Sequence, residues 1–287
     1  MELIQMQAKI AITTLATMVG LATTAVGCGG MSAYARSTME LEKKVSHDLE
    51  DIARSVHCVR VSATYEADNE NALLKLKKTE RKGHGTAFAF AADEQTTYLL
   101  TAAHVVEVEE HWTHWLFGSF TLASKSVKLV DNRFDNKEDD DVSVEVFATY
   151  PGVDLAVLRA KKKLHVSHAY KTVDSGKLHV AEAAYIVGYP RAVASFVSVG
   201  TIGNVKGVPH YNENDLPCLV MVDAEISPGN SGSPLFVRRG DELYFAGMMR
   251  GAMAQVSFGI GNACIEGRLP RVGTKTTGPG GLEGSAK

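Results

Sequence analysis

Three residues of the sequence have side chains that together can perform nucleophilic catalysis. His104 follows a hydrophobic run that ends in small residues, Asp154 precedes a second hydrophobic run, and Ser231 lies in the glycine-containing loop 227–234. A serine hydroxyl is a weak nucleophile unless an imidazole accepts its proton, and a carboxylate holds that imidazole in the required tautomer. The sequence therefore predicts a triad in which Ser231 is the nucleophile, His104 the general base and then acid, and Asp154 the orienting carboxylate.

The glycines beside Ser231 predict an oxyanion hole. We expect the backbone N–H groups of Gly229 and Ser231 to point at one spot, where they would stabilise the negative oxygen that develops during attack on a carbonyl. Glycine adopts the required backbone conformation at little cost in free energy. An esterase of the α/β-hydrolase type is excluded, because Ser233 occupies the second glycine position of G-x-S-x-G and because that triad would run Ser, Asp, His.

The composition is that of a globular chain. It has 287 residues, of which 45% are hydrophobic and 22% charged, and a net charge of -3. This charge balance argues against a protein whose main partner is nucleic acid, since such proteins need a basic face. The hydrophobic fraction is too high for a disordered chain, and the cysteines are too few for a disulfide framework. No long uncharged apolar run follows the first thirty residues, which excludes a multi-span membrane protein.

The elements that hold the predicted triad residues in place are short β-rich runs, which turn residues separate. No long helical pattern lies between them, so the sequence predicts an all-β barrel or sandwich. The expected strands cover residues 59–63, 98–101, 126–130, 142–148, 155–158, 184–187, 196–202, 219–222, 234–237 and 243–249.

The first 35 residues have the features of an export signal. The uncharged stretch 10–26 is long enough for the core of a signal peptide and marginal for a membrane span. The Ala-Tyr-Ala motif at 33–35 predicts cleavage before Arg36, whereas the sequence around Cys28 resembles the end of a lipoprotein signal, with a lipid on the thiol. Both routes and an uncleaved anchor stay open. Each predicts an exported protein, periplasmic or secreted, that contacts a membrane only through this terminus.

The segments on either side of the predicted domain have simpler patterns. Apolar residues recur every three or four positions up to Val56, which predicts an amphipathic lead-in helix over 36–56. The body of the protein is expected to cover 57–270. The glycine-rich tail 271–287 has no periodicity and is expected to be disordered.

No metal site or cofactor is predicted. Outside the export signal the cysteines are Cys58, Cys218 and Cys264, none of which belongs to a C-x-x-C pair. We expect buried thiols in preference to a disulfide. The segment 111–115 (His-Trp-Thr-His-Trp) lacks a third ligand nearby and is expected to be an exposed or partner-facing loop.

Further motifs resemble the HtrA (Deg) family of trypsin-like serine proteases, and the resemblance covers about residues 55–268. It implies a chymotrypsin-like fold of two six-stranded antiparallel β-barrels, about 57–165 and 176–268, with His104 and Asp154 on the first and Ser231 on the second. It also implies hydrolysis of peptide bonds in unfolded or misfolded exported proteins, and assembly into a homo-oligomer. The motifs lie at 83–88, 174–180, 185–190, 199–202, 222–232 and 259–263.

Two features depart from the family pattern. Fewer than twenty residues follow Leu269, so the PDZ domain common in the family is not expected. Arg250 occupies a position where relatives have a small polar residue near the triad carboxylate. It can pair with Asp154 and weaken the hold on His104, pair with Glu225, or point to solvent. These departures keep open a second function, a catalytically silent or latent protein that binds polypeptides in a chaperone-like way.

The substrate pocket has two competing predictions. Glu225 occupies the position that forms the floor of the specificity pocket in trypsin-like enzymes, and a carboxylate there favours Lys or Arg before the cleaved bond. The family pattern instead lines the pocket with Ile226 and Met248, close to Arg250, and favours aliphatic residues. We favour the aliphatic preference.

Overall fold

The computed structural model describes residues 33–68, 76–130, 141–205, 218–253 and 256–270. The predictions for the export signal up to residue 32, including Cys28, and for the tail 271–287 lie outside these residues. The chain divides into two compact units, Met1–Glu42 and Lys43–Lys287. In the first unit the described residues form the beginning of helix α2 (Ala33–Ala53). No helix among the described residues combines the length and the apolar composition needed to cross a membrane.

Helix α2 starts and ends earlier than the predicted 36–56. It stops at Ala53 because the chain turns there, with the N–H of Ser55 donating to the carbonyl of Ile52, and Val56 already pairs with Phe88 as the first residue of strand β1. Within the second unit, Val45 and Ile52 of this helix are buried in the hydrophobic core, as the helical period of apolar residues requires.

The first barrel is a closed antiparallel sheet in the order β1-β2-β3-β7-β6-β5, and pairing of β5 with β1 closes it. A short strand β4 pairs with the beginning of β5 in antiparallel orientation. Alternate residues of β1 are buried, which is the period expected where one face of a sheet covers a core. The strands are β1 (Val56–Ala67), β2 (Lys78–Ala92), β3 (Thr97–Thr101), β4 (His111–His114), β5 (Gly118–Val130), β6 (Val142–Tyr150) and β7 (Leu155–Ala160).

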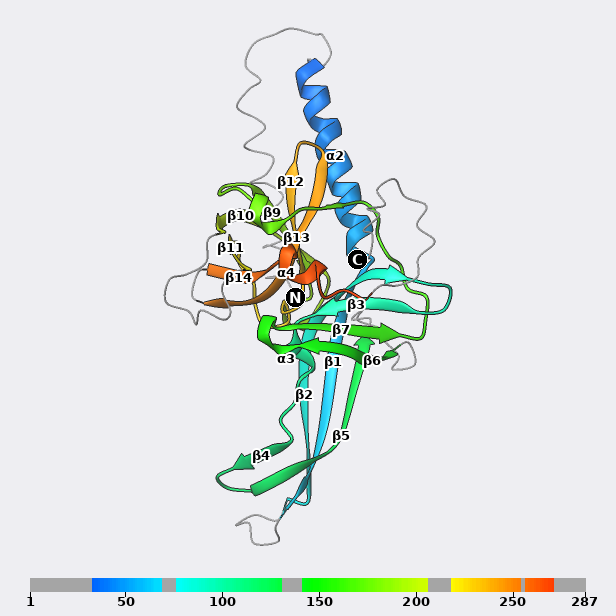
Figure 1. The fold of residues 1–287 in the computed structure, drawn as a ribbon, viewed down its shortest axis with the longest axis vertical. Coiled ribbons are helices and arrows are strands. Elements are labelled where there is room, and N and C mark those ends of the chain that lie inside the picture. The colour runs from blue at the N-terminus through cyan, green and yellow to red at the C-terminus, as the bar shows by residue number, and fades with distance from the viewer. Residues whose placement is uncertain (1–32, 69–75, 131–140, 206–217, 254–255, 271–287) are drawn as a thin grey trace, which may run out of the picture. The chain divides into compact units, whose positions relative to one another are not determined.

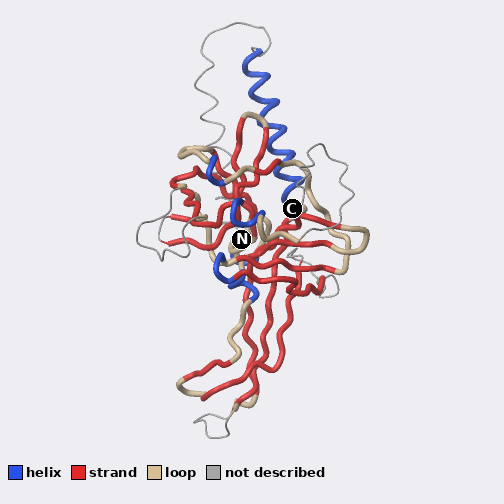
Figure 2. Tube along the Cα trace, viewed as in Figure 1, coloured by secondary structure: helices blue, strands red, loops and turns tan. Residues whose placement is uncertain are grey.

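The second barrel has the order β12-β9-β10-β11-β14-β13 and is closed by pairing of β12 with β13. Strand β8 (Lys171–Thr172) joins β13 in parallel. The two closed six-stranded barrels confirm the predicted fold class, and strands dominate the described part of the chain (Figures 1 and 2). The strands are β9 (Ala183–Gly188), β10 (Phe196–Asn204), β11 (Leu219–Asp223), β12 (Pro234–Arg239), β13 (Glu242–Met253) and β14 (Val256–Gly261).

Short helices connect the strands. In the first barrel these are α3 (Ala103–Val106), between β3 and β4, and the 3₁₀ turn η3 (Pro151–Val153), between β6 and β7. The second barrel has η4 (Ser175–Lys177) and η5 (Pro190–Ala192), and helix α4 (Asn262–Glu266) follows β14.

An aromatic cluster joins the two barrels. Phe88 on β2 lies 5.7 Å from Phe245 on β13 and 5.9 Å from Phe236 on β12, measured between ring centroids, and Tyr170 packs against all three. Burial raises the pKa of Tyr170 to about 12. Burying each such ring contributes about 1.5–3 kcal/mol. The cluster therefore holds the barrels in one arrangement, so that residues from both can meet in one site.

The cysteines differ from the expectation of buried thiols. Cys218 and Cys264 form a disulfide, with their Cα atoms 5.9 Å apart. The pair meets because β11 and β14 are neighbours in the barrel, with Leu219 opposite Ile260. Cys58 is buried on β1 and keeps its thiol.

Candidate active site

His104 and Asp154 meet at the end of the first barrel. The Nδ1–H of His104 donates to Oδ2 of Asp154 at 2.8 Å, and the backbone N–H of His104 donates to Oδ1 at 2.9 Å. One carboxylate thus fixes both the ring and the start of helix α3, which carries His104. The imidazole side chain is 49% exposed and the carboxylate 8% exposed. The buried carboxylate therefore orients an imidazole that solvent can reach.

The backbone at Asp154 is unusual and directs its side chain. Asp154 follows turn η3 with φ of 54°, a left-handed conformation that aspartate tolerates better than most residues. Its own N–H donates to the carbonyl of Pro151, and its carbonyl accepts from Ala103. Burial acts to raise the pKa of Asp154, but hydrogen bonds donated by His104 and Arg250 outweigh it and hold this pKa below its ordinary value. The carboxylate is therefore anionic at neutral pH.

Ser231 lies on the loop between β11 and β12, in the second barrel. Its Oγ–H donates to the backbone carbonyl of Arg250 on β13 at 3.0 Å. Within the described residues no hydrogen bond joins Ser231 to His104. The Ser231 hydroxyl thus points to strand β13. The side chain of Arg250, on the same strand, contacts Asp154.

Two glycines beside Ser231 have a left-handed backbone conformation. Gly229 and Gly232 have φ of 103° and 90°, where a side chain would be strained. A Cβ on Gly229 would also meet the carbonyl oxygen of Tyr189. In the part of the chain that the structure describes, no backbone carbonyl accepts the N–H of Gly229 or of Ser231. Both donors are therefore available to an incoming oxygen.

Thr86 connects this loop to the first barrel. Its Oγ1–H donates to the carbonyl of Gly229 at 2.7 Å, and its N–H donates to the carbonyl of Ser231 at 2.8 Å. Thr101 donates to the Thr86 carbonyl at 2.7 Å, and the side-chain hydrogen bonds of both threonines are buried. No sequence pattern predicts this role of Thr86, although the residue lies within the motif 83–88. Thr86 holds the loop that carries Ser231 against the barrel that carries His104 and Asp154.

Arg250 pairs with the carboxylate of Asp154. Its Nε–H donates to Oδ2 of Asp154 at 2.9 Å, the same oxygen that accepts from His104. Of the three orientations open from the sequence, this one is present in the structure. The guanidinium side chain is 27% exposed. A cation therefore competes with the imidazole for one carboxylate oxygen.

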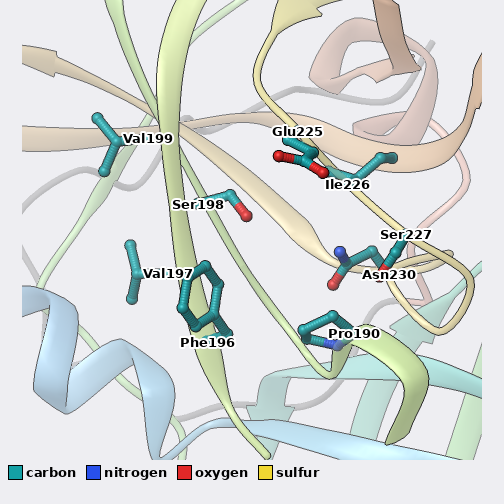
Figure 3. Close-up of a pocket in the computed structure, with 9 residues that line it drawn as sticks. All are labelled: Pro190, Phe196, Val197, Ser198, Val199, Glu225, Ile226, Ser227 and Asn230. Atoms are coloured by element: carbon teal, nitrogen blue, oxygen red, sulfur yellow. The ribbon is translucent and has the colours of Figure 1, made fainter. Parts of the chain in front are cut away.

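The four residues expected around the specificity pocket do not gather in one place. Glu225 and Ile226 line a pocket of about 430 Å³ together with residues of β10 and with Asn230 (Figure 3). Met248 is buried in the hydrophobic core, and Arg250 lies on Asp154. The pocket thus lies between β10 and the segment that precedes Ser231.

The segment 111–115 forms strand β4 and the turn that follows it. Trp112 packs on Phe120 with 5.1 Å between ring centroids, while the side chain of Trp115 is 85% exposed. Among the described residues no three His, Cys, Asp or Glu side chains gather as metal ligands would.

Comparison with known proteins shows to which family the chain belongs. Residues 85–244, more than half of the chain, match the trypsin-like peptidase domain family. A probable periplasmic serine endoprotease, DegP-like, from Pseudomonas putida is 28% identical over 166 residues, which cover 58% of this chain and 29% of that protein. The chloroplastic Protease Do-like 5 of Arabidopsis thaliana is 27% identical over 158 residues, 54% of this chain and 45% of that one. The chain thus spans less than half the length of these relatives.

Solved structures show the same fold. The crystal structure of Deg5 superposes with a TM-score of 0.52 at 19% identity, covering 79% of this chain and 92% of that one. The HtrA-type protease AlgW with a decapeptide gives a TM-score of 0.52 at 20% identity, covering 77% and 64%. These matches and the two barrels lead to one conclusion: the chain belongs to the trypsin-like peptidase domain family, and its relatives include the DegP-like and Deg proteases.

Proposed function

We propose that this protein is a serine endopeptidase that hydrolyses peptide bonds in polypeptide substrates. The observation that carries the proposal is the double hydrogen bond from His104 to the buried carboxylate of Asp154. Close to that pair, Gly229 and Ser231 offer unpaired backbone donors within the described residues. Family membership supports the same reaction.

The proposed reaction begins when the Ser231 hydroxyl rotates from the Arg250 carbonyl to the Nε2 of His104. As Oγ attacks the substrate carbonyl carbon, Nε2 takes the hydroxyl proton and the carbonyl oxygen becomes an anion held by the N–H groups of Gly229 and Ser231. The imidazolium then gives its proton to the departing amine, and the C–N bond breaks. A water molecule, deprotonated by the same imidazole, releases the acid from Ser231 by the reverse steps.

A serine-directed phosphonate and casein provide the test. We expect the phosphonate to label Ser231, and Ser231→Ala to lower kcat for casein by about 10⁶. Ser124→Ala, which changes an exposed serine of β5, should behave like the unchanged protein. Absence of labelling by several phosphonates, in protein shown to be folded by circular dichroism, would refute the proposal.

A second candidate function rests on the observed direction of the Ser231 hydroxyl. Because Oγ donates to Arg250 and not to His104, the geometry is also that of a latent or catalytically silent protein that binds polypeptides in the cleft. Suppression of aggregation that is the same in Ser231→Ala, with no casein cleavage by the unchanged protein, would favour this function. Cleavage that disappears in Ser231→Ala would exclude it.

The substrate preference belongs to the same proposal. We infer an aliphatic residue before the cleaved bond, since Ile226 and the apolar side chains of β10 line the pocket beside Glu225. Mass spectrometry of products from a peptide library would show the preference. Predominant cleavage after Lys or Arg, abolished in Glu225→Gln, would contradict it.

Export and the class of natural substrate complete the proposal. We propose that the protein acts outside the cytoplasm on unfolded or misfolded polypeptides, as a periplasmic or secreted enzyme, and that it self-associates. The name of the DegP-like relative, which is called periplasmic, supports the location, and the exposed Trp115 supports self-association. The mass of the mature N-terminus would distinguish cleavage before Arg36 from a lipid on Cys28, and light scattering would report the oligomer.

A further inference from the structure

Arg250 contacts both halves of the proposed active site. Its Nε–H donates to Oδ2 of Asp154, in the first barrel, at 2.9 Å. Its backbone carbonyl accepts from the hydroxyl of Ser231, in the second barrel, at 3.0 Å. The guanidinium therefore lies beside the space that a substrate attacked by Ser231 would occupy.

Most of the hydrogen-bonding capacity of this guanidinium is unused. A guanidinium has five N–H groups, and within the described residues only the Nε–H of Arg250 has a partner. The N–H groups of Nη1 and Nη2 make no hydrogen bond or ion pair in that part of the chain. Since the side chain is 27% exposed, a substrate group that displaces water can reach these donors.

A bulge in strand β13 directs the side chain of Arg250. The pairing of β13 with β14 shifts between Met249 and Gly251, so Arg250 is the extra residue of the bulged strand. A bulge changes the direction of a side chain from the one that regular alternation would give it. Met249 is fully buried, whereas Arg250 reaches the carboxylate of Asp154 in the other barrel.

The net charge at this place changes during the proposed reaction. While the imidazole of His104 is neutral, the guanidinium of Arg250 and the carboxylate of Asp154 carry one charge of each sign. When Nε2 of His104 takes the serine proton, the three side chains together become positive by one charge. A negative group on the Nη side of Arg250 is therefore bound more strongly in the transition state, and such an interaction increases the rate.

A side-chain carboxylate is the negative group that a polypeptide substrate can supply. A guanidinium and a carboxylate form two parallel, charge-assisted hydrogen bonds, which fix the direction of approach as well as the partner. A glutamine side chain has a similar shape but lacks the charge. The comparison of Glu with Gln in a substrate therefore isolates this contact.

The residue directly before the cleaved bond is a poor position for this carboxylate. Glu225 lines the pocket that we assign to that residue, and its charge would repel a second carboxylate (Figure 3). An extended chain advances by about 3.3 Å per residue. Side chains one or two residues away therefore stay within reach of a guanidinium beside Ser231.

We propose that Arg250 is a specificity-determining residue whose Nη groups bind the carboxylate of a substrate Asp or Glu, one or two residues away from the residue that precedes the cleaved bond. The bound carboxylate also compensates the positive charge that opposes the imidazolium. This inference rests on the proposed peptidase function and narrows its substrates to polypeptides that carry an acidic residue close to an aliphatic one.

Turnover is tested with four pairs of fluorogenic peptides that all have Leu before the cleaved bond. In each pair, one of the two positions before Leu or of the two after it holds Glu in one peptide and Gln in the other. We expect the Glu peptide of at least one pair to have a kcat/KM about three- to tenfold higher, with part of the difference in kcat. A difference confined to KM would refute the charge compensation and support the contact alone.

Variants of Arg250 show whether the preference comes from this side chain. Arg250→Ser should give the two peptides of the pair equal rates, and Arg250→Lys should keep part of the difference, because it retains the charge without the planar pair of donors. Arg159→Ser, which removes an arginine that pairs with Glu145, is the matched control and should keep all of it. Equal rates for Glu and Gln in every pair, or a preference that Arg250→Ser leaves unchanged, would overturn the proposal.

Binding separates this inference from the peptidase function. Fluorescence anisotropy of the labelled peptides is measured with Ser231→Ala, which lacks the proposed nucleophile. We expect the Glu peptide to bind about two- to fivefold more tightly than the Gln peptide, and the added change Arg250→Ser to remove the difference. If this difference is present but the unchanged protein cleaves no peptide and takes up no phosphonate, the peptidase function is refuted and the carboxylate contact is supported. Cleavage after Leu with no difference in either assay would refute the carboxylate contact alone.

Discussion

Removal of the Arg250 guanidinium tests whether this residue controls the reactivity of the site. In Arg250→Ser the carboxylate of Asp154 keeps its two hydrogen bonds from His104 and loses the one from the guanidinium. The cation that opposes the imidazolium formed during attack is then gone. The rate of attack by Ser231 should therefore rise.

The size of this increase follows from the geometry. The nitrogens of His104 and Arg250 lie 2.8 and 2.9 Å from the same oxygen. At a separation of about 6 Å and an effective dielectric constant of about 20–40, two unit charges repel by about 1.4–2.8 kcal/mol, which corresponds to a change in rate of about ten- to a hundredfold. Since the His104 side chain is 49% exposed, solvent screening reduces the expected increase to about three- to tenfold.

The assay is the second-order rate of phosphonate labelling of Ser231, measured at one fixed, mildly alkaline pH. Arg250→Lys keeps a positive charge and should leave the rate nearer to that of the unchanged protein. The matched control is Arg159→Ser, which removes an arginine that pairs with Glu145 on the first barrel. An unchanged rate in folded Arg250→Ser, or an equal increase in the control, would refute the electrostatic role. A lower rate would instead show a purely structural role.

Three further results are expected. Gly229→Ala should lower the labelling rate by about 10²–10³, because a side chain at φ of 103° would turn one oxyanion donor away; an unchanged rate would contradict this. Serine in place of Cys218 and Cys264 should lower the free energy of unfolding in urea by about 2–4 kcal/mol, and reductant should then have no further effect. Since the pKa of Asp154 is lowered in the folded state, its ionised form stabilises the fold above its unfolded pKa and loses this effect as the pH falls through the folded pKa. Arg250→Ser should accordingly destabilise the protein at neutral pH but not in acid, and an equal loss at both pH values would argue against this linkage.

Local sequence patterns predict the residues that carry the proposed chemistry. His104, Asp154 and Ser231 each adjoin a hydrophobic run that becomes a strand or a short helix of the barrels. Strand β6 was evident from its period of two, because one face of a barrel strand covers the core and the other does not.

Strand β2 shows where local pattern fails. Its first half, from Lys78 to Gly85, is rich in charge and glycine and mostly exposed, so it was not among the expected strands. It is a strand because its backbone pairs with β1 along its length, for example Arg60 with His84 and Tyr65 with Thr79. Backbone hydrogen bonds to a neighbouring strand do not depend on the side-chain pattern.

The contacts that set the state of the site depend on closure of the barrels. Arg250 reaches Asp154 from 96 residues away, Thr86 reaches Gly229 from 143 residues away, and Cys218 meets Cys264. Neighbours along the chain specify which side chains are available and in what order, because strand period and turn chemistry are local properties. A hydrogen bond forms only where its donor and acceptor are placed to within a few tenths of an ångström. That placement comes from the packing of the two barrels against each other, and no local sequence pattern determines it.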